Sequence, residues 1–316
     1  MMKMEKMATR EGYGKALVKL GAEQQNIVVL DADLAKSTKS YEFCKHYPER
    51  FFNMGIAEQN LMGAAAGLAA SGKIVFASTF AIFATGRAFE QIRNSIAYPK
   101  LNVKIAASHA GLTVGEDGAS HQAIVDISIM RSLPNMTVIA PADGVEAEKA
   151  VCAAAQYEGP VYLRLGRSAV PVIYGEEHEF TIGKASQLRE GHDATIFACG
   201  IMVAESLQAA EELAGEGLAV RVINMATIKP LDQEAVLRAA RETGAIVTAE
   251  EHSVIGGLGS AVAEVLVENA PIPMERVGVR DTFGESGKPQ ALLEKYGLTA
   301  KEIKEAVYRV IERKNK

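Results

Sequence analysis

The 316-residue sequence lacks tryptophan, contains only three cysteines and has no apolar run long enough to cross a membrane. The cysteines, Cys44, Cys152 and Cys199, are widely spaced and odd in number, which indicates free thiols in a reducing compartment rather than disulfides or a metal site. The longest apolar run, 61–70, is far shorter than the roughly 20 residues of a membrane helix, and the first ten residues show no signal-peptide core. These absences predict a cytoplasmic protein that does not act with a membrane.

The chain also lacks an excess of basic residues. Its 34 Lys and Arg residues stand against 39 Asp and Glu, a formal net charge of -5, so the charge balance provides no support for a nucleic-acid partner. With 48% hydrophobic and 23% charged residues, the composition is that of an ordinary globular protein with a large core. At about 150 residues per domain, the length is enough for two domains.

Short apolar segments alternate with helical ones along the first half of the sequence. A helix is expected over 11–24, with Thr9 as its N-cap, and the polar segment 31–40 is expected to be a loop. Strands separated by helices at this spacing predict a parallel sheet covered on both faces. The strands are expected at 27–30, 74–77, 103–107, 137–140 and 161–165, and the further helices at 60–70, 83–98, 125–133 and 145–157.

A charged stretch from 173 to 192 interrupts this alternation, and we interpret it as a linker. The alternation then resumes, so the expected fold class is α/β with two domains, 1–172 and 193–316, each a mostly parallel sheet with helices on both faces. In the second domain the strands are expected at 195–198, 219–224, 245–249 and 276–279, and the helices at 202–214, 233–242, 260–269 and 300–313.

The segment 51–72, FFNMGIAEQNLMGAAAGLAASG, places one carboxylate, Glu58, at the start of an unusually apolar helix. One interpretation is an acid that complements the positive end of the helix dipole, which contributes a few tenths to about 1 kcal/mol. The other is a buried acid with a catalytic task. Residues 63–70 have little side-chain bulk, which predicts a close contact with another helix, including one across a subunit interface.

The densest polar segment is 108–122, SHAGLTVGEDGASHQ, which directly follows a predicted strand. It places His109, Glu116, Asp117 and His121 among three glycines that permit unusual backbone angles. At the carboxyl end of a parallel strand, such side chains are suited to binding several hydroxyl groups and moving protons. A solvated loop without function is the alternative. The spacing does not match a metal site, so no metal ligands are expected.

Two aromatic residues allow a second kind of binding. Phe80 and Phe83 lie three apart after the second main predicted strand. They are either core residues or a surface on which a flat heterocycle stacks.

Arginines and a glycine-rich turn are weaker signals. Arg10, Arg164 and Arg167 are candidate anion binders because guanidinium binds phosphate in a bidentate manner, although most arginines are surface charges. The segment 256–260, GGLGS, superficially resembles a dinucleotide-binding loop. It lacks the third glycine of that motif, so a close turn from a strand into a helix is preferred.

Five segments, taken in order, resemble the pyrimidine-binding domain of transketolases: GIAEQN, STFAIF, SHAGLTVGEDGASHQ, RSLPNMTVIAPADGVEA and LRLGR. The later EEHSVIGGLGSAVAE is similar to the C-terminal domain of that family, so the resemblance covers nearly the whole chain. The strand and helix plan and GIAEQ are shared with the wider thiamine diphosphate group. His109, in S-H-A-G, favours transketolase over 1-deoxyxylulose-phosphate synthase, which typically has arginine there.

The sequence departs from full-length transketolases in one large respect. Those proteins begin with a domain that binds the cofactor's diphosphate and Mg²⁺ through a GDG motif followed by a distant asparagine, and nothing in this sequence matches it. The chain thus resembles the second half of a split transketolase. This implies a separate N-terminal subunit that binds the diphosphate and Mg²⁺, within a homodimer or heterotetramer. A smaller departure is Gly86, where the family often has a third aromatic residue.

The resemblance also implies roles for single residues. Glu58 would bind the aminopyrimidine ring nitrogen of thiamine diphosphate and favour the tautomer that generates the ylid, with Phe83 stacked on that ring and Phe80 beside it. Asp33 and Ile56 are expected at the cofactor as well. The remaining residues are expected at the sugar. Asp117 and His121 would contact its hydroxyl groups near the reacting carbons, where His121 is also a catalytic candidate, and the phosphate end would be bound by Arg10, Ser37, His109 and Arg167.

The implied activity is transfer of a two-carbon ketol unit between a ketose phosphate and an aldose phosphate, a reaction of pentose phosphate metabolism. Two alternatives stay open. One is the corresponding subunit of a 1-deoxyxylulose-phosphate synthase-like or 2-oxo-acid dehydrogenase enzyme, and the other is a non-catalytic regulatory partner. Retention of Glu58, Phe83, Asp117 and His121 argues against the non-catalytic alternative.

Overall fold

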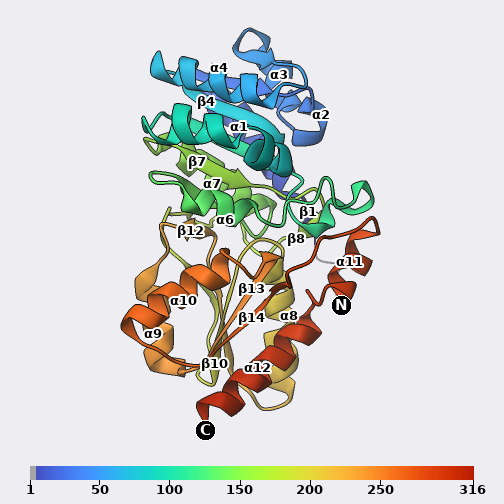
Figure 1. Ribbon diagram of the computed structural model, residues 1–316, viewed down its shortest axis with the longest axis vertical. Helices are drawn as coiled ribbons and strands as arrows, with labels where there is room; N and C mark the ends of the chain where they lie inside the picture. The colour runs from blue at the N-terminus through green and yellow to red at the C-terminus, as the bar shows by residue number, and fades with distance from the viewer. Residues whose placement is uncertain (1–4) are drawn as a thin grey trace.

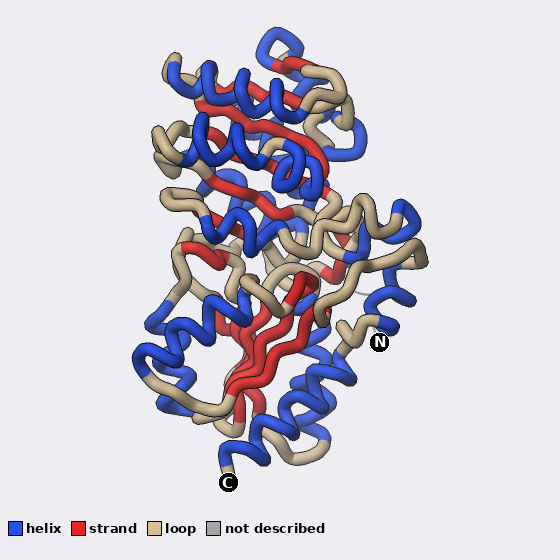
Figure 2. Tube along the Cα trace, in the orientation of Figure 1, coloured by secondary structure: helices blue, strands red, loops and turns tan. Residues whose placement is uncertain are grey.

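The computed structural model describes residues 5–316, which form two large sheets flanked by helices and one short ribbon (Figure 1). The ribbon pairs β1 (Lys6–Met7) with β8 (Val170–Pro171) in antiparallel register. In Figure 2 the strands of the two sheets stand in separate halves of the molecule, each surrounded by helices. The predicted α/β fold with two mostly parallel sheets is therefore confirmed.

The first sheet has seven strands, and it draws on both halves of the sequence. From edge to edge it runs β12 (Thr227–Lys229), β6 (Thr137–Ile139), β7 (Val161–Arg164), β5 (Val103–Ser108), β4 (Ile74–Phe80), β2 (Ile27–Asp31) and β3 (Phe51–Asn53). All neighbours pair in parallel except β12, which is antiparallel to β6. Six carboxyl ends therefore lie along one edge of this sheet, where open α/β sheets place ligands.

Alternation of side chains in β2 explains why helices cover both faces of this sheet. Ile27 and Val29 pack in one cluster with α1 (Thr9–Glu23), α3 (Tyr41–His46) and α7 (Gly144–Gln156). Val28 and Leu30 pack in another cluster on the opposite face. The helical segments through which the first domain contributes to that second cluster are α4 (Glu58–Ala70), η2 (Phe83–Arg87), α5 (Phe89–Gln91), η3 (Ile92–Ala97) and α6 (Asp126–Ser132).

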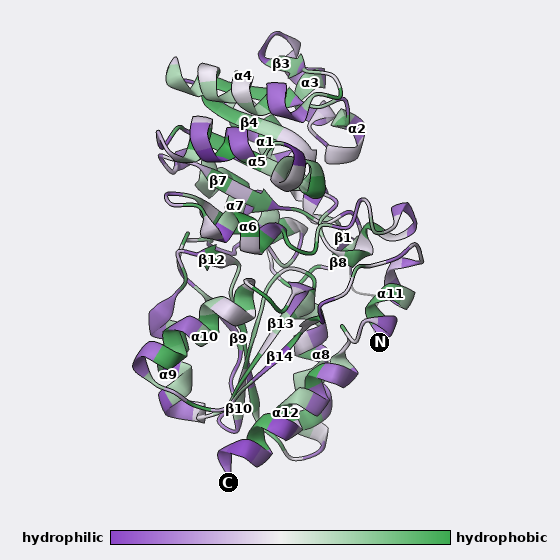
Figure 3. Ribbon diagram, in the orientation of Figure 1, coloured by the Kyte–Doolittle hydropathy of each residue, from purple (hydrophilic) through white to green (hydrophobic). Residues whose placement is uncertain are grey.

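The second sheet is built in the same way. Its order is β14 (Met274–Val279), β13 (Ile246–Ser253), β10 (Ala194–Ala198), β11 (Val220–Asn224) and β9 (Ser186–Arg189), with only β9 antiparallel. β9 lies within the stretch that the sequence predicts as a linker. One face packs on α9 (Gln233–Thr243) and α10 (Leu258–Asn269), and the other on α8 (Met202–Gly215) and α12 (Ala300–Lys314). The alternating hydropathy of α12 is visible in Figure 3.

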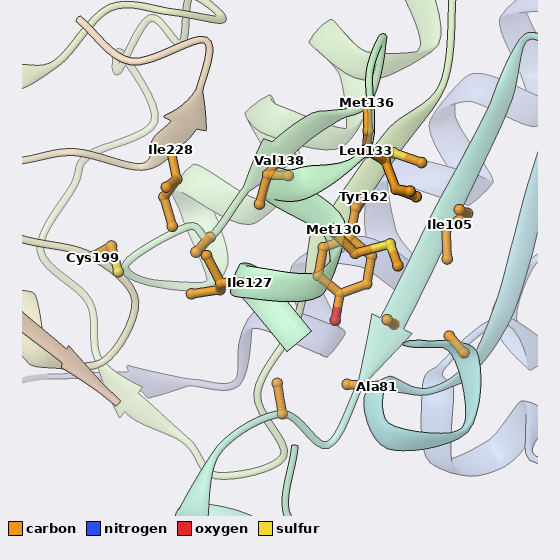
Figure 4. Packing of buried hydrophobic residues seen from close by; sticks show 14 of the residues in the cluster. Ala81, Ile105, Ile127, Met130, Leu133, Met136, Val138, Tyr162, Cys199 and Ile228 are labelled. Atoms are coloured by element: carbon orange, nitrogen blue, oxygen red, sulfur yellow. The ribbon is translucent and has the colours of Figure 1, made fainter. Parts of the chain in front are cut away.

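The hydrophobic core is continuous between the two sheets. Figure 4 shows Ile228 of β12 and Cys199, which follows β10, near Ile127 and Val138 of the first domain. These four residues belong to one buried cluster. The two domains are therefore joined by packing as well as by the chain.

Two local predictions near the N-terminus are wrong. Thr9 is not an N-cap: it is the first residue of α1, after Ala8, and its hydroxyl accepts a hydrogen bond from Gly166 N at 2.7 Å. The polar segment 31–40 is not a simple loop, because it contains α2 (Ala35–Thr38). A one-turn helix without an apolar stripe gives no periodic signal.

The expected helix over 83–98 is also different. It is interrupted by the π-helical turns η2 and η3, and Ala88 N donates to Phe83 O at 3.3 Å, a bond across five residues. Such a turn accommodates an extra residue in a helix and often occurs at functional sites. Hydrophobic periodicity does not reveal it.

Two other sequence predictions agree with the described residues. The three cysteines are free thiols. The turn at 256–260 leads from β13 into α10, where Leu258 N and Gly259 N donate to the carboxylate of Glu250 at 2.7 and 2.8 Å. No helix among residues 5–316 is both long and apolar enough to cross a membrane. On α4, a Cβ added at Gly63 or Gly67 would meet no atom of the described residues within 4 Å, so no other helix among them packs against these two glycines.

Candidate functional site

The predicted site residues converge on the carboxyl edge of the first sheet. Asp33 follows β2, Glu58 follows β3, Phe83 follows β4, His109 follows β5 and Arg167 follows β7. These segments are distant in the sequence, and parallel pairing is what brings their ends together.

Glu58 is the first residue of α4, and its side chain is only 2% exposed. Its Oε1 accepts a hydrogen bond from Nη1 of Arg87 at 2.9 Å. The Arg87 guanidinium also lies over the ring of Phe83, with 4.4 Å between Cζ and the ring centroid. Arg87 was not singled out from the sequence. The signal that could have revealed it is its distance of four residues from Phe83, which is close to one helical turn.

Two phenylalanines and two histidines form one cluster. The rings of Phe80 and Phe83 stack with centroids 5.8 Å apart, and the imidazole of His109 stacks on Phe80 at 3.8 Å. The ring of His121 meets Phe83 edge-on at 5.3 Å. The structure therefore brings the predicted aromatic wall and the two histidines of the 108–122 segment into direct contact.

His109 has a left-handed backbone, with φ of 58°, and is 3% exposed. Burial, together with the charges of Arg10, Arg167 and His121, lowers the pKa of His109 to about 3. Its ring is therefore neutral at physiological pH and offers one donor and one acceptor rather than a positive charge. Nδ1 lies 2.9 Å from Ser108 Oγ.

Two further arginines bring positive charge to the site. Arg10 donates to Ser37 O at 2.8 Å, and its buried Nε has no hydrogen-bond partner among the described residues. Burial lowers the pKa of Arg10, and the charge of Arg167 acts in the same direction. Arg167 donates to Val114 O and, at 3.1 Å, to Glu116. Two like charges held near each other, one with an unused buried donor, indicate a place for an anion.

The segment after β2 is fixed by an acid that the sequence analysis did not single out. Asp31 is fully buried and accepts hydrogen bonds from Leu34 N, Thr38 Oγ1 and Ser40 Oγ at 2.6, 2.7 and 2.8 Å. Burial raises the pKa of Asp31. This network sets the position of Ser37, which lies inside the segment.

Three predicted residues are exposed. Asp33 accepts a hydrogen bond from the side chain of Asn53 at 2.8 Å. Asp117 lies at the end of η4 (Leu112–Asp117), and Ile56 is 79% exposed.

Arg164 does not bind a free anion, contrary to one option from the sequence. It is buried, and its Nε donates to Asp126 Oδ2 at 2.8 Å. Tyr162 donates to the same carboxylate oxygen at 2.7 Å. Within residues 5–316, no three His, Cys, Asp or Glu side chains are grouped as metal ligands.

We predict that the imidazole of His109 stays neutral from pH 8 down to about 5. The folded ring takes up a proton near pH 3 and the unfolded ring near 6.5, so the unfolded state binds more protons between these values. The contribution of this residue to the free energy of unfolding therefore falls as the pH drops through that window. The ring C2–H chemical shift, followed by NMR against pH, measures this directly.

The variant His109→Gln is the control for that titration. It should show a flatter decline of unfolding free energy between pH 6.5 and 4 than the wild type, because Gln does not titrate. An inflection of the assigned His109 signal between pH 5 and 8 would contradict the prediction.

Comparison with known proteins places this chain in a family. Residues 5–172 match the family model of the transketolase pyrimidine-binding domain, and residues 183–303 match that of the transketolase C-terminal domain. The 6-deoxy-6-sulfo-D-fructose transketolase subunit of Clostridium sp. (strain MSTE9) is 51% identical over 314 residues, which cover 99% of this chain and 98% of that protein. An apulose-4-phosphate transketolase subunit of Phocaeicola vulgatus is 40% identical over 92% of this chain and 94% of its own length.

A solved structure agrees with both sequence comparisons. The structure described as a split gene transketolase, inactive beta4 tetramer, is 63% identical, with a TM-score of 0.92 over 98% of this chain and 99% of that one. Two successive domain matches and near full-length relatives lead to one conclusion. The chain belongs to the transketolase family.

Proposed function

We propose that this chain is the pyrimidine-binding and C-terminal subunit of a two-chain transketolase that uses thiamine diphosphate. A separate N-terminal subunit supplies the diphosphate and Mg²⁺ site. The assembled enzyme transfers a two-carbon ketol unit from a ketose phosphate to an aldose phosphate. The observation that carries the proposal is the buried carboxylate of Glu58, linked through Arg87 to the ring of Phe83.

The residues fit an aminopyrimidine ring. A buried carboxylate binds a ring nitrogen strongly, and the face of Phe83 stacks on a flat heterocycle. Arg87 shows that a planar, N–H-bearing group can contact both residues at once, because it does so itself. Its side chain is half exposed, so it can leave Glu58 as the ring binds without disturbing the core.

Each residue then has a definite task on the cofactor side. Bound thiamine diphosphate supplies a thiazolium ring that accepts and releases the two-carbon unit. Glu58 holds and exchanges a proton at the pyrimidine nitrogen. Phe83 orients the pyrimidine, with Phe80 behind it, and Ile56 and Asp33 border the cofactor at the surface that the partner covers.

The cationic end of the site binds the charged end of the sugar. Arg10 and Arg167 provide the positive charge, and neutral His109 contributes a hydrogen bond. Asp117 and His121 bind hydroxyl groups closer to the reacting carbons. Since one relative is named for a sulfonated sugar and another for a sugar phosphate, the group bound by these arginines is either sulfonate or phosphate.

A 1-deoxyxylulose-phosphate synthase-like enzyme, a 2-oxo-acid dehydrogenase subunit and a non-catalytic partner remain alternatives. The first two use an oxo acid such as pyruvate in place of a ketose donor. The stacked and neutral His109 supports a sugar substrate, because it presents a hydrogen-bonding ring where the synthase family carries a fixed charge.

The test of the whole proposal is reconstitution. The purified chain alone should show no ketol transfer and weak binding of thiamine diphosphate, because it provides only the pyrimidine side of the site. Adding a partner that carries the GDG motif should restore transfer from a ketose phosphate to an aldose phosphate. Robust turnover by the isolated chain would refute the proposal, as would a reconstituted complex that accepts pyruvate but no ketose.

Glu58→Gln keeps the size of the side chain and removes its ionisable proton. We expect ketol transfer by the reconstituted enzyme to fall by roughly 10²-fold or more, the range typical of a general acid-base group. The matched control is Glu49→Gln, which makes the same change at an exposed acid of the same domain and should leave the rate unchanged. If E58Q stays within a few-fold of the wild type, Glu58 only complements the helix dipole.

Arg167→Ala tests the charged end of the substrate. Loss of a charge-assisted hydrogen bond, about 1.5 to 3 kcal/mol, should lower kcat/KM for a phosphorylated ketose roughly ten- to hundred-fold. Hydroxypyruvate has no phosphate, so its kcat/KM should change little. Equal losses for both donors, or none for either, would remove Arg167 from the substrate site. Including a sulfonated ketose in the same assay distinguishes the two anions.

A further inference from the structure

The segment from His109 to Ala123, called here the 109–123 loop, carries His109, Asp117 and His121. It is closed at its base by Gly111 N, which donates to Ala123 O at 2.9 Å. Beyond this base, the loop projects as η4 and contacts the C-terminal domain at several points. The C-terminal domain has no residue in the proposed site, but it contacts the loop that carries three of the site's residues.

Glu251 of β13 makes the most buried of these contacts. Its side chain is 3% exposed, and Oε1 accepts a hydrogen bond from Thr113 N at 2.6 Å. The carboxyl group also fills the space beside Gly111, where an added Cβ would lie 2.2 Å from Glu251 Cδ. Gly111 has φ of 82°, so a glycine here permits both the left-handed backbone angle and the close approach of the Glu251 carboxyl group.

Arg164 ties the same strand to the base of the loop. Its Nη2 donates to Glu251 O at 2.9 Å and to Ala123 O at 3.2 Å, while Asp126 holds its Nε. Burial raises the pKa of Glu251 to about 7, and both Arg164 and the Thr113 N–H oppose that rise. Groups that the loop and its base supply therefore offset part of the cost of burying this carboxyl.

A second anchor lies beside the base of the loop, at Gln122. Gln122 Nε2 donates to Leu112 O at 3.1 Å and to Glu285 O, in the C-terminal domain, at 2.9 Å. A Cβ added at Gly118 would lie 2.5 Å from Ser286 Oγ. The loop therefore lies between β13 and the segment that precedes α11 (Pro289–Lys295), and it contacts both.

We propose that the C-terminal domain is a clamp for the 109–123 loop, and that Glu251 is the positioning residue through which it acts. Glu251 does not touch the substrate; it fixes the Thr113 amide and thereby the placement of His109, Asp117 and His121. This role in sugar binding rests on the function proposed above. The clamp itself does not, and it can be measured without activity.

The test uses Glu251→Asp, which keeps the charge and draws the acceptor back by about 1.5 Å, one carbon–carbon bond. Hydrogen exchange of the complete chain, read by mass spectrometry, should speed up about tenfold or more in peptides covering 109–123 and stay unchanged in α12. Glu251→Gln keeps an acceptor for Thr113 N and should restore slow exchange. In the reconstituted enzyme, E251D should lower kcat/KM for the sugar donor about five- to fifty-fold, with thiamine diphosphate affinity unchanged.

Glu205→Asp is the matched control. Glu205 lies in the same domain, and its Oε2 likewise accepts a backbone hydrogen bond, from Ala300 N at 2.9 Å, but this bond is to the first residue of α12 and not to the loop.

Gln122→Met, which removes the second anchor at similar volume, provides the same loop measurement if E251D does not fold. Loop exchange at the wild-type rate in E251D, or in Q122M where E251D is unfolded, would overturn the clamp. So would equal loop exchange in E251D and E205D, or fast exchange in E251Q. Fast loop exchange with unchanged sugar kinetics would support the clamp and contradict the sugar site.

Discussion

Parallel pairing of β7, β5, β4, β2 and β3 is the constraint on which the site depends. Each strand delivers the residue that follows it to one edge, so a carboxylate, an aromatic wall and an arginine from distant parts of the chain meet there. The helices α1 and α7 on one face and α4 and α6 on the other make these strands a buried unit. A register shift in an inner strand would move its terminal residue along the edge. A shift between β4 and β5, for example, would separate Phe80 from His109 and remove their ring stack.

The sequence predicted the inner strands and most of the long helices, because short apolar runs and helical periodicity mark them locally. It did not predict the short strands β1, β3, β8, β9 and β12. It singled out Glu58, Phe80, Phe83 and His109, which the structure brings to one edge. Arg87 and Asp31 were missed. Arg87 matters through its contact with Glu58, 29 positions away in the sequence, and Asp31 through its contacts with a one-turn helix that has no periodic pattern. The π-helical turn η2 is equally invisible to a pattern of 3.6 residues per turn, yet it places Arg87 where it reaches both Glu58 and Phe83.

Arg164 is the opposite case: the sequence suggested it as an anion binder, and the structure shows that it is buried and paired. As a sequence signal it was equivalent to Arg167, since both lie at the end of the same predicted strand and both are guanidinium groups. The difference is burial: Arg164 is enclosed and pairs with Asp126, whereas Arg167 is partly exposed at the edge. Burial of a charge with a matched partner is a property of three-dimensional packing, and no residue type in the sequence specifies it.

Adjacent residues of β13 show how one strand serves both stability and the site. Side chains alternate along a strand, so Glu250 and Glu251 point in opposite directions. Glu250 turns into its own domain and accepts hydrogen bonds from the first N–H groups of α10, which stabilises the start of that helix. Glu251 turns outward to Thr113 of the other domain. Both carboxylates are buried and accept hydrogen bonds from backbone N–H groups. Because side chains alternate along the strand, Glu250 stabilises its own domain, whereas Glu251 contacts the 109–123 loop.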